Sequence, residues 1–107
     1  MTKLKAIIID SNEWATAPWL QRVTFPVKVS VTNLSVGDAW LSCQDAAIIV
    51  ERKTPSDLLA SIADGRLFAQ CAAMMAASPW SYLVVTGFWT VRGHHVQLDY
   101  QSTQWND

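Results

Sequence analysis

Apolar residues along the chain fall into short runs separated by polar stretches, which is the pattern of β-strands joined by turns. Two runs are almost continuously apolar, as in buried strands, and another alternates valine with polar residues, as in a half-buried strand. The predicted strands are residues 4–10, 26–32, 39–43, 46–53 and 82–87, the last of them buried. Residues 11–19 are polar and irregular, so a loop or short turn is expected there.

Two helices are predicted between the last two of these strands. Thr54 can act as the N-cap of the first, Pro55 suits its first position, and Asp57 stands where the acid of a capping box would lie. The apolar face of this helix comprises Leu58, Leu59 and Ile62. An Asp-Gly-Arg sequence at 64–66 ends it, and a second helix over residues 66–78 follows. The apolar residues at helical spacing in that helix are Leu67, Cys71, Met74 and Met75.

The order of these elements predicts an α/β sandwich with a mixed sheet. A chain of 107 residues suffices for one compact domain, so residues 1–107 are expected to form a single one. Near the C-terminus, residues 89–98 are typical of a hairpin centred on Arg92, and Ser102 or Thr103 would open another helix. Because the chain stops about one turn later, a C-terminal segment is expected to be missing.

Composition narrows the function classes only slightly. The net charge is −1, so no overall basic field indicates a nucleic-acid partner, although a local patch can bind one. The N-terminal apolar run is too short for a signal peptide or a membrane span, and a cytoplasmic protein is expected. Cys43 and Cys71 match no metal-binding spacing and are expected to be buried free thiols. Neighbours on a strand point to opposite faces, so His94 and His95 are expected in a surface hairpin and not at a metal.

In the sequence IIVERKTPSD, residues 48–57, an apolar run is followed directly by a cluster of charged residues. Alternate residues of a strand share a face, so Glu51 and Lys53 point the same way and Arg52 points the other way. A carboxylate beside an ammonium group can hold a hard cation such as Mg²⁺ and stabilise negative charge on a phosphate. The pairing predicts a metal-assisted hydrolytic site, and Arg52 would either anchor a neighbouring acid or reach a phosphate.

Three further acids lie at the ends of predicted elements, where a fold can gather them around Glu51. Asp38 follows Gly37 and is the first candidate for a second metal ligand. Asp10 ends the first strand, and it would either complete the metal site or cap the next turn. Asp57 would contact the site, act as the capping-box acid of its helix, or do both.

These residues together resemble a known family. Gly37–Asp38, a twelve-residue gap and Glu-Arg-Lys-x-x-x-Asp at residues 51–57 are similar to the signature of the XPF/ERCC4 nuclease domains. The similarity continues in the segment SIADGRLFAQ, at Ser61, Gly65, Arg66 and Gln70. Upstream, Asp10 and Glu13 match the D-x-R-E stretch of that family, although Asn12 stands where an arginine is common.

The resemblance covers residues 4 to about 87 and implies a restriction-endonuclease-like fold, a three-layer sandwich with a mixed central sheet flanked by helices. It implies an endonuclease that needs Mg²⁺ or Mn²⁺ and no small-molecule cofactor, often acts on branched, flapped or forked DNA, and can form a homodimer. The compact chain is most similar to short phage and prokaryotic members, with no helix-hairpin-helix module visible. The metal ligands implied are Asp10, Asp38 and Glu51, and the catalytic residues add Lys53 and Asp57.

Some roles stay open at this level. The family contains catalytically silent members used for dimerisation or DNA binding, but these typically lose the acids or the lysine, all of which are present here. Arg66 and Gln70 lie one turn apart on the second predicted helix and would either approach DNA or support the site from behind. Glu13 would lie in a substrate loop or in solvent. The six tryptophans would stack on bases or, for most of them, pack in the core or an interface.

Overall fold

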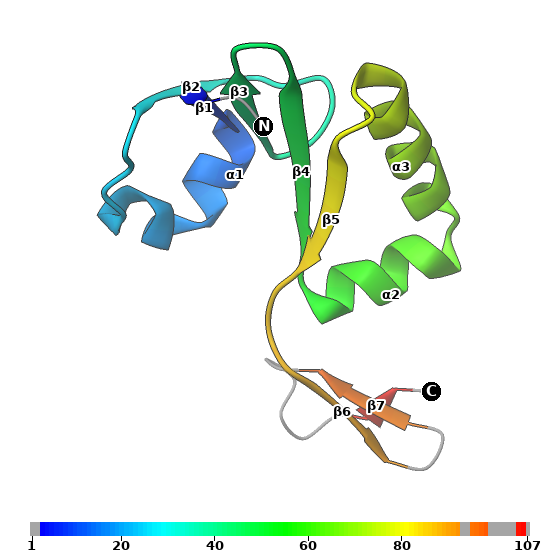
Figure 1. The fold of residues 1–107 in the computed structure, drawn as a ribbon. Helices are drawn as coiled ribbons and strands as arrows, with labels where there is room; N and C mark the ends of the chain where they lie inside the picture. Colours follow the sequence, from blue (N-terminus) through cyan, green and yellow to red (C-terminus); the bar gives the residue numbers. More distant parts are fainter. Residues whose placement is uncertain (1–2, 93–94, 99–104, 107) are drawn as a thin grey trace.

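A five-stranded mixed sheet with the strand order β2-β1-β3-β4-β5 forms the centre of the fold (Figure 1). The computed structural model describes residues 3–92, 95–98 and 105–106, and the side chains of residues 3–88. Strand β1 pairs in parallel with β2 and antiparallel with β3, and β4 pairs antiparallel with β3 and in parallel with β5. The strands are β1 (Leu4–Asp10), β2 (Lys28–Thr32), β3 (Ala39–Cys43), β4 (Ala47–Lys53) and β5 (Ser81–Val85). The predicted mixed α/β sheet and its strands are confirmed.

One face of the sheet is covered at β1 and β3 by two short helices, α1 (Ser11–Thr16) and the 3₁₀ helix η1 (Pro18–Arg22). Ile9 of β1 and Leu20 of η1 are buried in this layer, and Phe25, Val27, Val29 and Leu41 pack around them. Ile7 and Ile9 of β1 point into this layer, while Ala6 and Ile8 point to the opposite face, because neighbouring residues of a strand alternate in direction.

The opposite face is covered at β4 and β5 by α2 (Pro55–Ala63) and α3 (Arg66–Ala77), so helices lie on both sides of the sheet (Figure 1). Ile49 at the middle of β4 is fully buried, and Met74 of α3 is almost completely buried. Ser78, after α3, donates from its Oγ to the carbonyl oxygen of Ala47 at 2.6 Å and ties the end of the helix to the start of β4.

Both helices begin and end as the sequence predicts. The Thr54 hydroxyl accepts a hydrogen bond from the backbone N–H of Asp57 at 3.2 Å, and Pro55 occupies the first helical position. Gly65, with φ of +83°, separates α2 from α3 in the left-handed conformation that glycine adopts without strain. The strong local signals of this segment therefore fix its structure.

Three expectations about the chain are wrong. Residues 11–19 are not a loop, because Asp10 caps α1 by accepting a hydrogen bond from the N–H of Asn12 and Pro18 opens η1. The fifth strand is not buried, since Tyr82, Leu83, Val84 and Val85 are 38–50% exposed. On the helices, Ile62 and Met75 face solvent, because only α2 and α3 cover this side and their outer surfaces have no neighbour among the described residues.

The C-terminal part forms a separate antiparallel sheet of β6 (Trp89–Arg92), β7 (His95–Leu98) and β8 (Trp105–Asn106). The predicted hairpin is confirmed by the pairing of β6 with β7. The helix expected after Ser102 or Thr103 is wrong at Trp105 and Asn106, because these two residues form β8 and pair with β7. The two candidate caps lie outside the described residues, as do Gly93 and His94.

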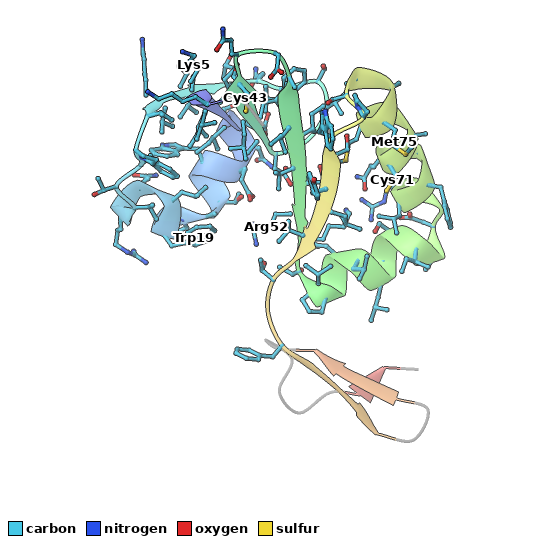
Figure 2. All side chains as sticks on the ribbon, in the orientation of Figure 1. Lys5, Trp19, Cys43, Arg52, Cys71 and Met75 are labelled. Carbon is cyan, nitrogen blue, oxygen red and sulfur yellow. The ribbon has the colours of Figure 1, made fainter. Side chains whose placement is uncertain are left out.

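Both cysteines are free thiols, as predicted, but they are half-buried and lie far apart, Cys43 at the end of β3 and Cys71 within α3 (Figure 2). Within the part of the chain that the structure describes, no helix has the length and apolar character that crossing a membrane requires.

Candidate active site

Asp38 is held in place by the backbone of two strands. Its N–H donates to the carbonyl oxygen of Val50, and its own carbonyl oxygen accepts from the N–H of Asp10, both at 2.8 Å. Its carboxylate Oδ2 also accepts the backbone N–H of Arg52 at 2.7 Å. The residue before it, Gly37, has φ of +77°, which lets the loop turn into β3 at this point. Asp38 is therefore fixed against the C-terminal ends of β1 and β4.

Glu51 and Lys53 lie on the face of β4 that α2 and α3 cover, as strand parity predicts. The Lys53 Nζ is 3.9 Å from the Glu51 Oε2, and their side chains are only 6% and 15% exposed. A charged pair this far from water gains little hydration, so each group depends on its neighbours for stabilisation. The 3.9 Å separation also leaves both groups able to contact a third partner.

The two carboxylates of the site resist ionisation. Burial, followed by repulsion from Asp38, raises the pKa of Glu51 from its ordinary value of 4.5 to about 6, although Lys53 opposes this. Burial also raises the pKa of Asp38, while the hydrogen bond from the Arg52 N–H lowers it and the charge of Glu13 raises it further. The repulsion that Asp38 exerts on Glu51 is relieved when a cation or a proton joins them.

Asp10 lies beside this pair but uses both carboxylate oxygens within the fold. Oδ1 accepts the backbone N–H of Leu34 at 2.8 Å, and Oδ2 accepts that of Asn12 at 3.1 Å. The capping role that the sequence left open is therefore present in the structure. Each oxygen keeps a second lone pair, so capping and a contact with a cation are compatible.

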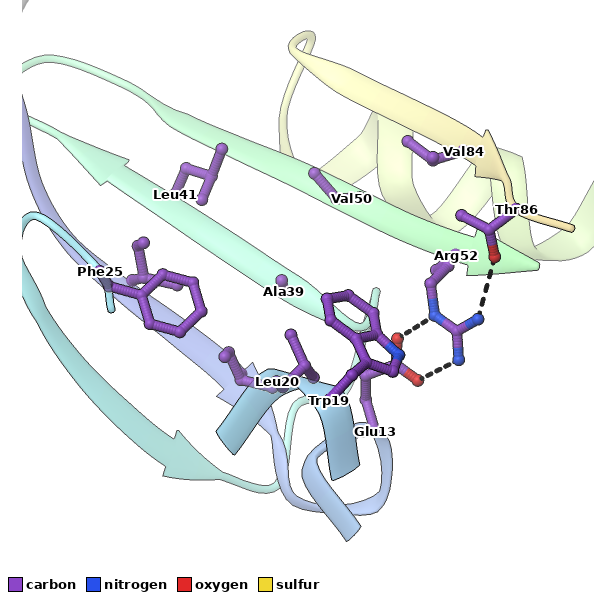
Figure 3. A pocket seen from close by; sticks show the side chains of 12 residues that line it. Glu13, Trp19, Leu20, Phe25, Ala39, Leu41, Val50, Arg52, Val84 and Thr86 are labelled. Atoms are coloured by element: carbon purple, nitrogen blue, oxygen red, sulfur yellow. Dashed lines mark hydrogen bonds and ion pairs between the residues drawn. The ribbon is translucent and has the colours of Figure 1, made fainter. Parts of the chain in front are cut away.

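Arg52 points to the other face of the sheet, as strand parity predicts, where it grips Glu13 (Figure 3). Its Nε donates to Glu13 Oε2 at 2.6 Å, its Nη2 donates to Oε1 at 3.1 Å, and its Nη1 donates to the Thr86 Oγ1 at 3.1 Å. The hydrogen bond to Glu13 raises the pKa of Arg52. Of the two roles left open for Arg52, anchoring an acid is the one the structure contains. The contact with Thr86 carried no signal in the sequence.

The Arg52–Glu13 pair closes one end of an apolar groove of about 280 Å³ on this face (Figure 3). Trp19 and Leu20 of η1 form one wall, and Val50 and Val84 of the sheet form the floor. Glu13 lies in α1 with its side chain only 12% exposed, so the solvent alternative is wrong, while a role towards substrate stays a prediction. Glu51 and Lys53 lie on the opposite face of β4 from this groove.

The remaining predicted residues divide between the surface and the site. Asp57 is exposed on the first turn of α2, where its N–H completes the cap with Thr54. Arg66 is exposed and pairs with Asp64, Nε to Oδ2 at 2.6 Å. Gln70, one turn later, instead lines a cavity of about 190 Å³ together with Glu51. Arg66 and Gln70 lie one turn apart on α3, as predicted, but Arg66 is exposed, whereas Gln70 lines the cavity beside Glu51.

The donor set of the site fits a hard cation with few protein ligands. Among the residues whose side chains are described, no three His, Cys, Asp or Glu side chains are grouped to enclose a metal ion. Mg²⁺, however, is usually held by one or two carboxylates and keeps several waters. Asp38 and Glu51 supply two carboxylates, and because burial raises the pKa of both, a cation beside them would favour their ionised forms.

Comparison with known proteins gives the family. The ERCC4 domain matches residues 9–107. The chain belongs to the ERCC4 domain family. Two solved structures of XPF from Aeropyrum pernix, one of them in complex with DNA, are 30% and 31% identical to it, each with a TM-score of 0.62. No curated protein matches the chain.

These two likenesses cover 78% of the chain and only 40% of each XPF chain, so this ERCC4 domain spans less than half the length of those relatives. The sheet and its flanking helices are the restriction-endonuclease-like α/β fold of the XPF nuclease domain. The family and fold expected from the Gly-Asp and Glu-Arg-Lys sequences are therefore confirmed.

Proposed function

We propose that this ERCC4 domain is a divalent-cation-dependent DNA endonuclease whose reaction takes place at Asp38, Glu51 and Lys53. One observation carries the proposal: Glu51, whose pKa is raised by burial and then by the charge of Asp38, lies 3.9 Å from the ammonium group of a lysine that is almost inaccessible to solvent. A fold has little reason to bury such a cluster for stability alone, because removing charges from water is costly. Perturbed acids of this kind are typical of functional sites.

Each residue has a distinct task in this proposal. Mg²⁺ or Mn²⁺, when bound at the carboxylate pair, supplies Lewis-acid chemistry and makes water a better nucleophile at neutral pH. Asp38 is held rigidly by the Arg52 N–H and by both neighbouring strands, so its carboxylate keeps one orientation. Lys53 places a positive charge near Glu51, where it offsets the negative charge that grows on a phosphate during attack.

Asp10 and Asp57 have supporting tasks. Asp10 fixes the loop that contains Leu34 and so shapes the approach to Asp38. Asp57 adds a negative charge to the first turn of α2, next to the end of β4, where the helix dipole stabilises it. Neither carboxylate is needed as a direct ligand for the site to work.

DNA is the proposed substrate because the solved XPF structure that this chain resembles is a complex with DNA. Branched, flapped or forked DNA is the preferred form in this proposal, since the motif residues are those of the XPF/ERCC4 nucleases. The net charge of −1 predicts weak DNA binding, because only local contacts with Lys and Arg side chains can neutralise phosphates.

A homodimer in the cytoplasm is the proposed state. Phe68 and Met75 of α3 are 72% and 69% exposed, and apolar side chains this accessible support a contact with a second copy. Sedimentation velocity at several protein concentrations measures the association directly. A single monomeric species up to 100-fold above the working concentration, on the order of micromolar, would contradict it.

The proposed function is tested by cleavage of labelled duplex, flap and fork DNA in Mg²⁺, Mn²⁺ or EDTA. Glu51→Gln and Lys53→Met should each reduce cutting by about 100-fold or more, because the first removes a carboxylate that holds the cation and the second removes a positive charge at the reacting phosphate. Lys5→Met is the matched control, since Lys5 is exposed on β1 and should cut like the wild type. Wild-type protein that is folded and binds DNA but cuts none of the substrates would indicate a catalytically silent module.

A further inference from the structure

Gln70 carries a polar atom that the fold leaves without a partner. Its Oε1 is buried and accepts no hydrogen bond from the protein. Burying an amide oxygen without a donor costs about 1–3 kcal/mol, so such an atom in a packed region calls for an explanation. The side chain comes from α3, whose last residues are tied to the start of β4 through Ser78.

The cavity beside Gln70 leads to the proposed catalytic residues. It measures about 190 Å³ and is bounded by Glu51 on β4, Gln70 on α3 and Gly37 in the loop before Asp38. A water molecule needs only about 10–15 Å³ of such volume, so the space admits several. Of the three α3 residues that line this space, Gln70, Ala73 and Met74, Gln70 is the one with a polar side chain that can bind solvent near Glu51.

The chemistry of the two side chains fixes what can join them. An ionised carboxylate and an amide oxygen both accept hydrogen bonds, and neither can donate to the other. A molecule that bridges them must therefore offer two donors, as water does. Such a bridge is enthalpically nearly as good as a direct hydrogen bond and leaves the Glu51 carboxylate restrained from one side.

We propose that Gln70 is a positioning residue for Glu51, acting through a water that donates one hydrogen bond to Gln70 Oε1 and the other to the Glu51 carboxylate. The restraint keeps Glu51 oriented towards Asp38, so that the pair is preorganised for a divalent cation. This inference rests on the proposed function, because it assigns Gln70 a role at the same site. Outer residues that orient metal ligands typically contribute 10–100-fold to metal affinity.

The test measures Mn²⁺ binding to the full 107-residue chain by electron paramagnetic resonance, together with thermal unfolding in EDTA. Gln70→Met removes the amide oxygen and keeps the length of the side chain. We expect it to weaken Mn²⁺ binding by about 10-fold or more. Its Tm in EDTA should stay close to that of the wild type, because the hydrogen bond that is lost is to a water and not to the protein. Gln44→Met, at an exposed position in the β3–β4 turn, is the matched control.

A second variant keeps the test decisive if Gln70→Met folds poorly. Gln70→Glu retains an acceptor oxygen at the same position, so it should bind Mn²⁺ at least as tightly as the wild type. Weaker binding by Gln70→Glu, or wild-type affinity in a folded Gln70→Met, would overturn the role of Gln70. Glu51→Gln distinguishes failure of the proposed function from failure of the role of Gln70. If the wild type binds no Mn²⁺, or if Glu51→Gln binds it as tightly as the wild type, the proposed function is wrong, and so is the role of Gln70.

Discussion

The Arg52 guanidinium holds the Glu13 carboxylate through two parallel hydrogen bonds, Nε to Oε2 at 2.6 Å and Nη2 to Oε1 at 3.1 Å. This pair joins the C-terminal end of β4 to α1, and the third contact of the guanidinium, with Thr86, adds the residue that follows β5. Three segments that are distant in sequence thus meet at one side chain. Because the backbone N–H of the same Arg52 binds Asp38, the pair also supports the geometry of the site on the opposite face.

Arg52→Met should lower the free energy of unfolding by about 1–3 kcal/mol, because it leaves the Glu13 carboxylate, whose side chain is 12% exposed, without its partner. Glu13→Gln should cost a similar amount, and the double variant less than the sum of the two. Urea unfolding of the four proteins measures the coupling. Arg66→Met is the control, since its pair with Asp64 is half exposed and should contribute little. Simple additivity of Arg52→Met and Glu13→Gln would show that the contact contributes nothing.

Gly37→Ala should both destabilise the protein and disturb Asp38. A Cβ at this position would lie 2.6 Å from the Cγ2 of Ile49, which is fully buried, so the core would have to move. We expect a loss of about 2–4 kcal/mol, from left-handed backbone strain and overpacking together.

Gly65→Ala isolates the backbone part of that loss. Its φ of +83° is close to that of Gly37, but a Cβ there would meet nothing within 4 Å. It should therefore cost only about 1 kcal/mol and leave Mn²⁺ affinity unchanged. Thermal unfolding and Mn²⁺ titration of both variants test this, and equal effects of the two would show that the contact with Ile49 is unimportant.

The stability of the protein in EDTA should depend on the ionisation of Glu51. The pKa of this carboxyl is about 6 in the folded state and 4.5 as its ordinary value, so the folded state binds more protons between these limits. The free energy of unfolding therefore falls as the pH rises from about 4.5 to about 6, where the carboxyl ionises in the folded protein. The raised pKa of Asp38 acts in the same direction.

Glu51→Gln removes this dependence, so its advantage in stability over the wild type should grow across the window and stay constant above it. Urea unfolding at several pH values from 4.5 to 7.5, an interval of about 3 units, measures the difference. Asp64→Asn is the control, because hydrogen bonds from Arg66 lower the pKa of Asp64 and move its titration below this window. A constant difference between Glu51→Gln and wild type at every pH would contradict the assignment.

Asp10→Ala should destabilise the protein by about 1–2 kcal/mol, since it removes the N-cap of α1 and frees the N–H of Leu34. Asp10→Asn keeps one acceptor oxygen and should lose less. If Asp10 acts only through the fold, Asp10→Asn should retain most of the Mn²⁺ affinity and cleavage. A loss of Mn²⁺ binding in Asp10→Asn as large as that in Glu51→Gln, at unchanged Tm, would instead make Asp10 a direct ligand.

The sequence alone predicted the structure correctly where the structure is determined by residues close together in the chain. The N-cap Thr54, the Pro55 that follows it and the glycine at 65 define α2 and the start of α3 without reference to the rest of the chain. The alternation Glu51, Arg52, Lys53 likewise fixes which groups share a face, because strand parity is a property of the backbone. These features led to the correct family and to the position of the candidate site.

The predictions that failed concern features that depend on contacts between residues distant in sequence. The polar composition of residues 11–19 indicated a loop and so hid a short helix, although capping of the next turn by Asp10 was among the expected roles. The apolar content of β5 indicated burial, but whether a strand is covered is decided by the elements packed on it and not by its own residues. The partner of Arg52, thirty-nine positions away at Glu13, and the cavity beside Gln70 exist only in three dimensions.

The two faces of β4 have a consequence for folding itself. If β4 paired with β3 one residue out of register, Arg52 would enter the acidic side of the sheet, and Glu51 and Lys53 would project into the apolar groove beside Trp19 and Leu20. Unpaired charges on an apolar surface would make that arrangement unstable, whereas Asp38 bonds β4 at both Val50 and Arg52 only in the native alignment. Residues 51–53, to which the proposed reaction is assigned, therefore also favour the native register of β4 against β3. A substitution that shifted this register would disturb the proposed active site as well.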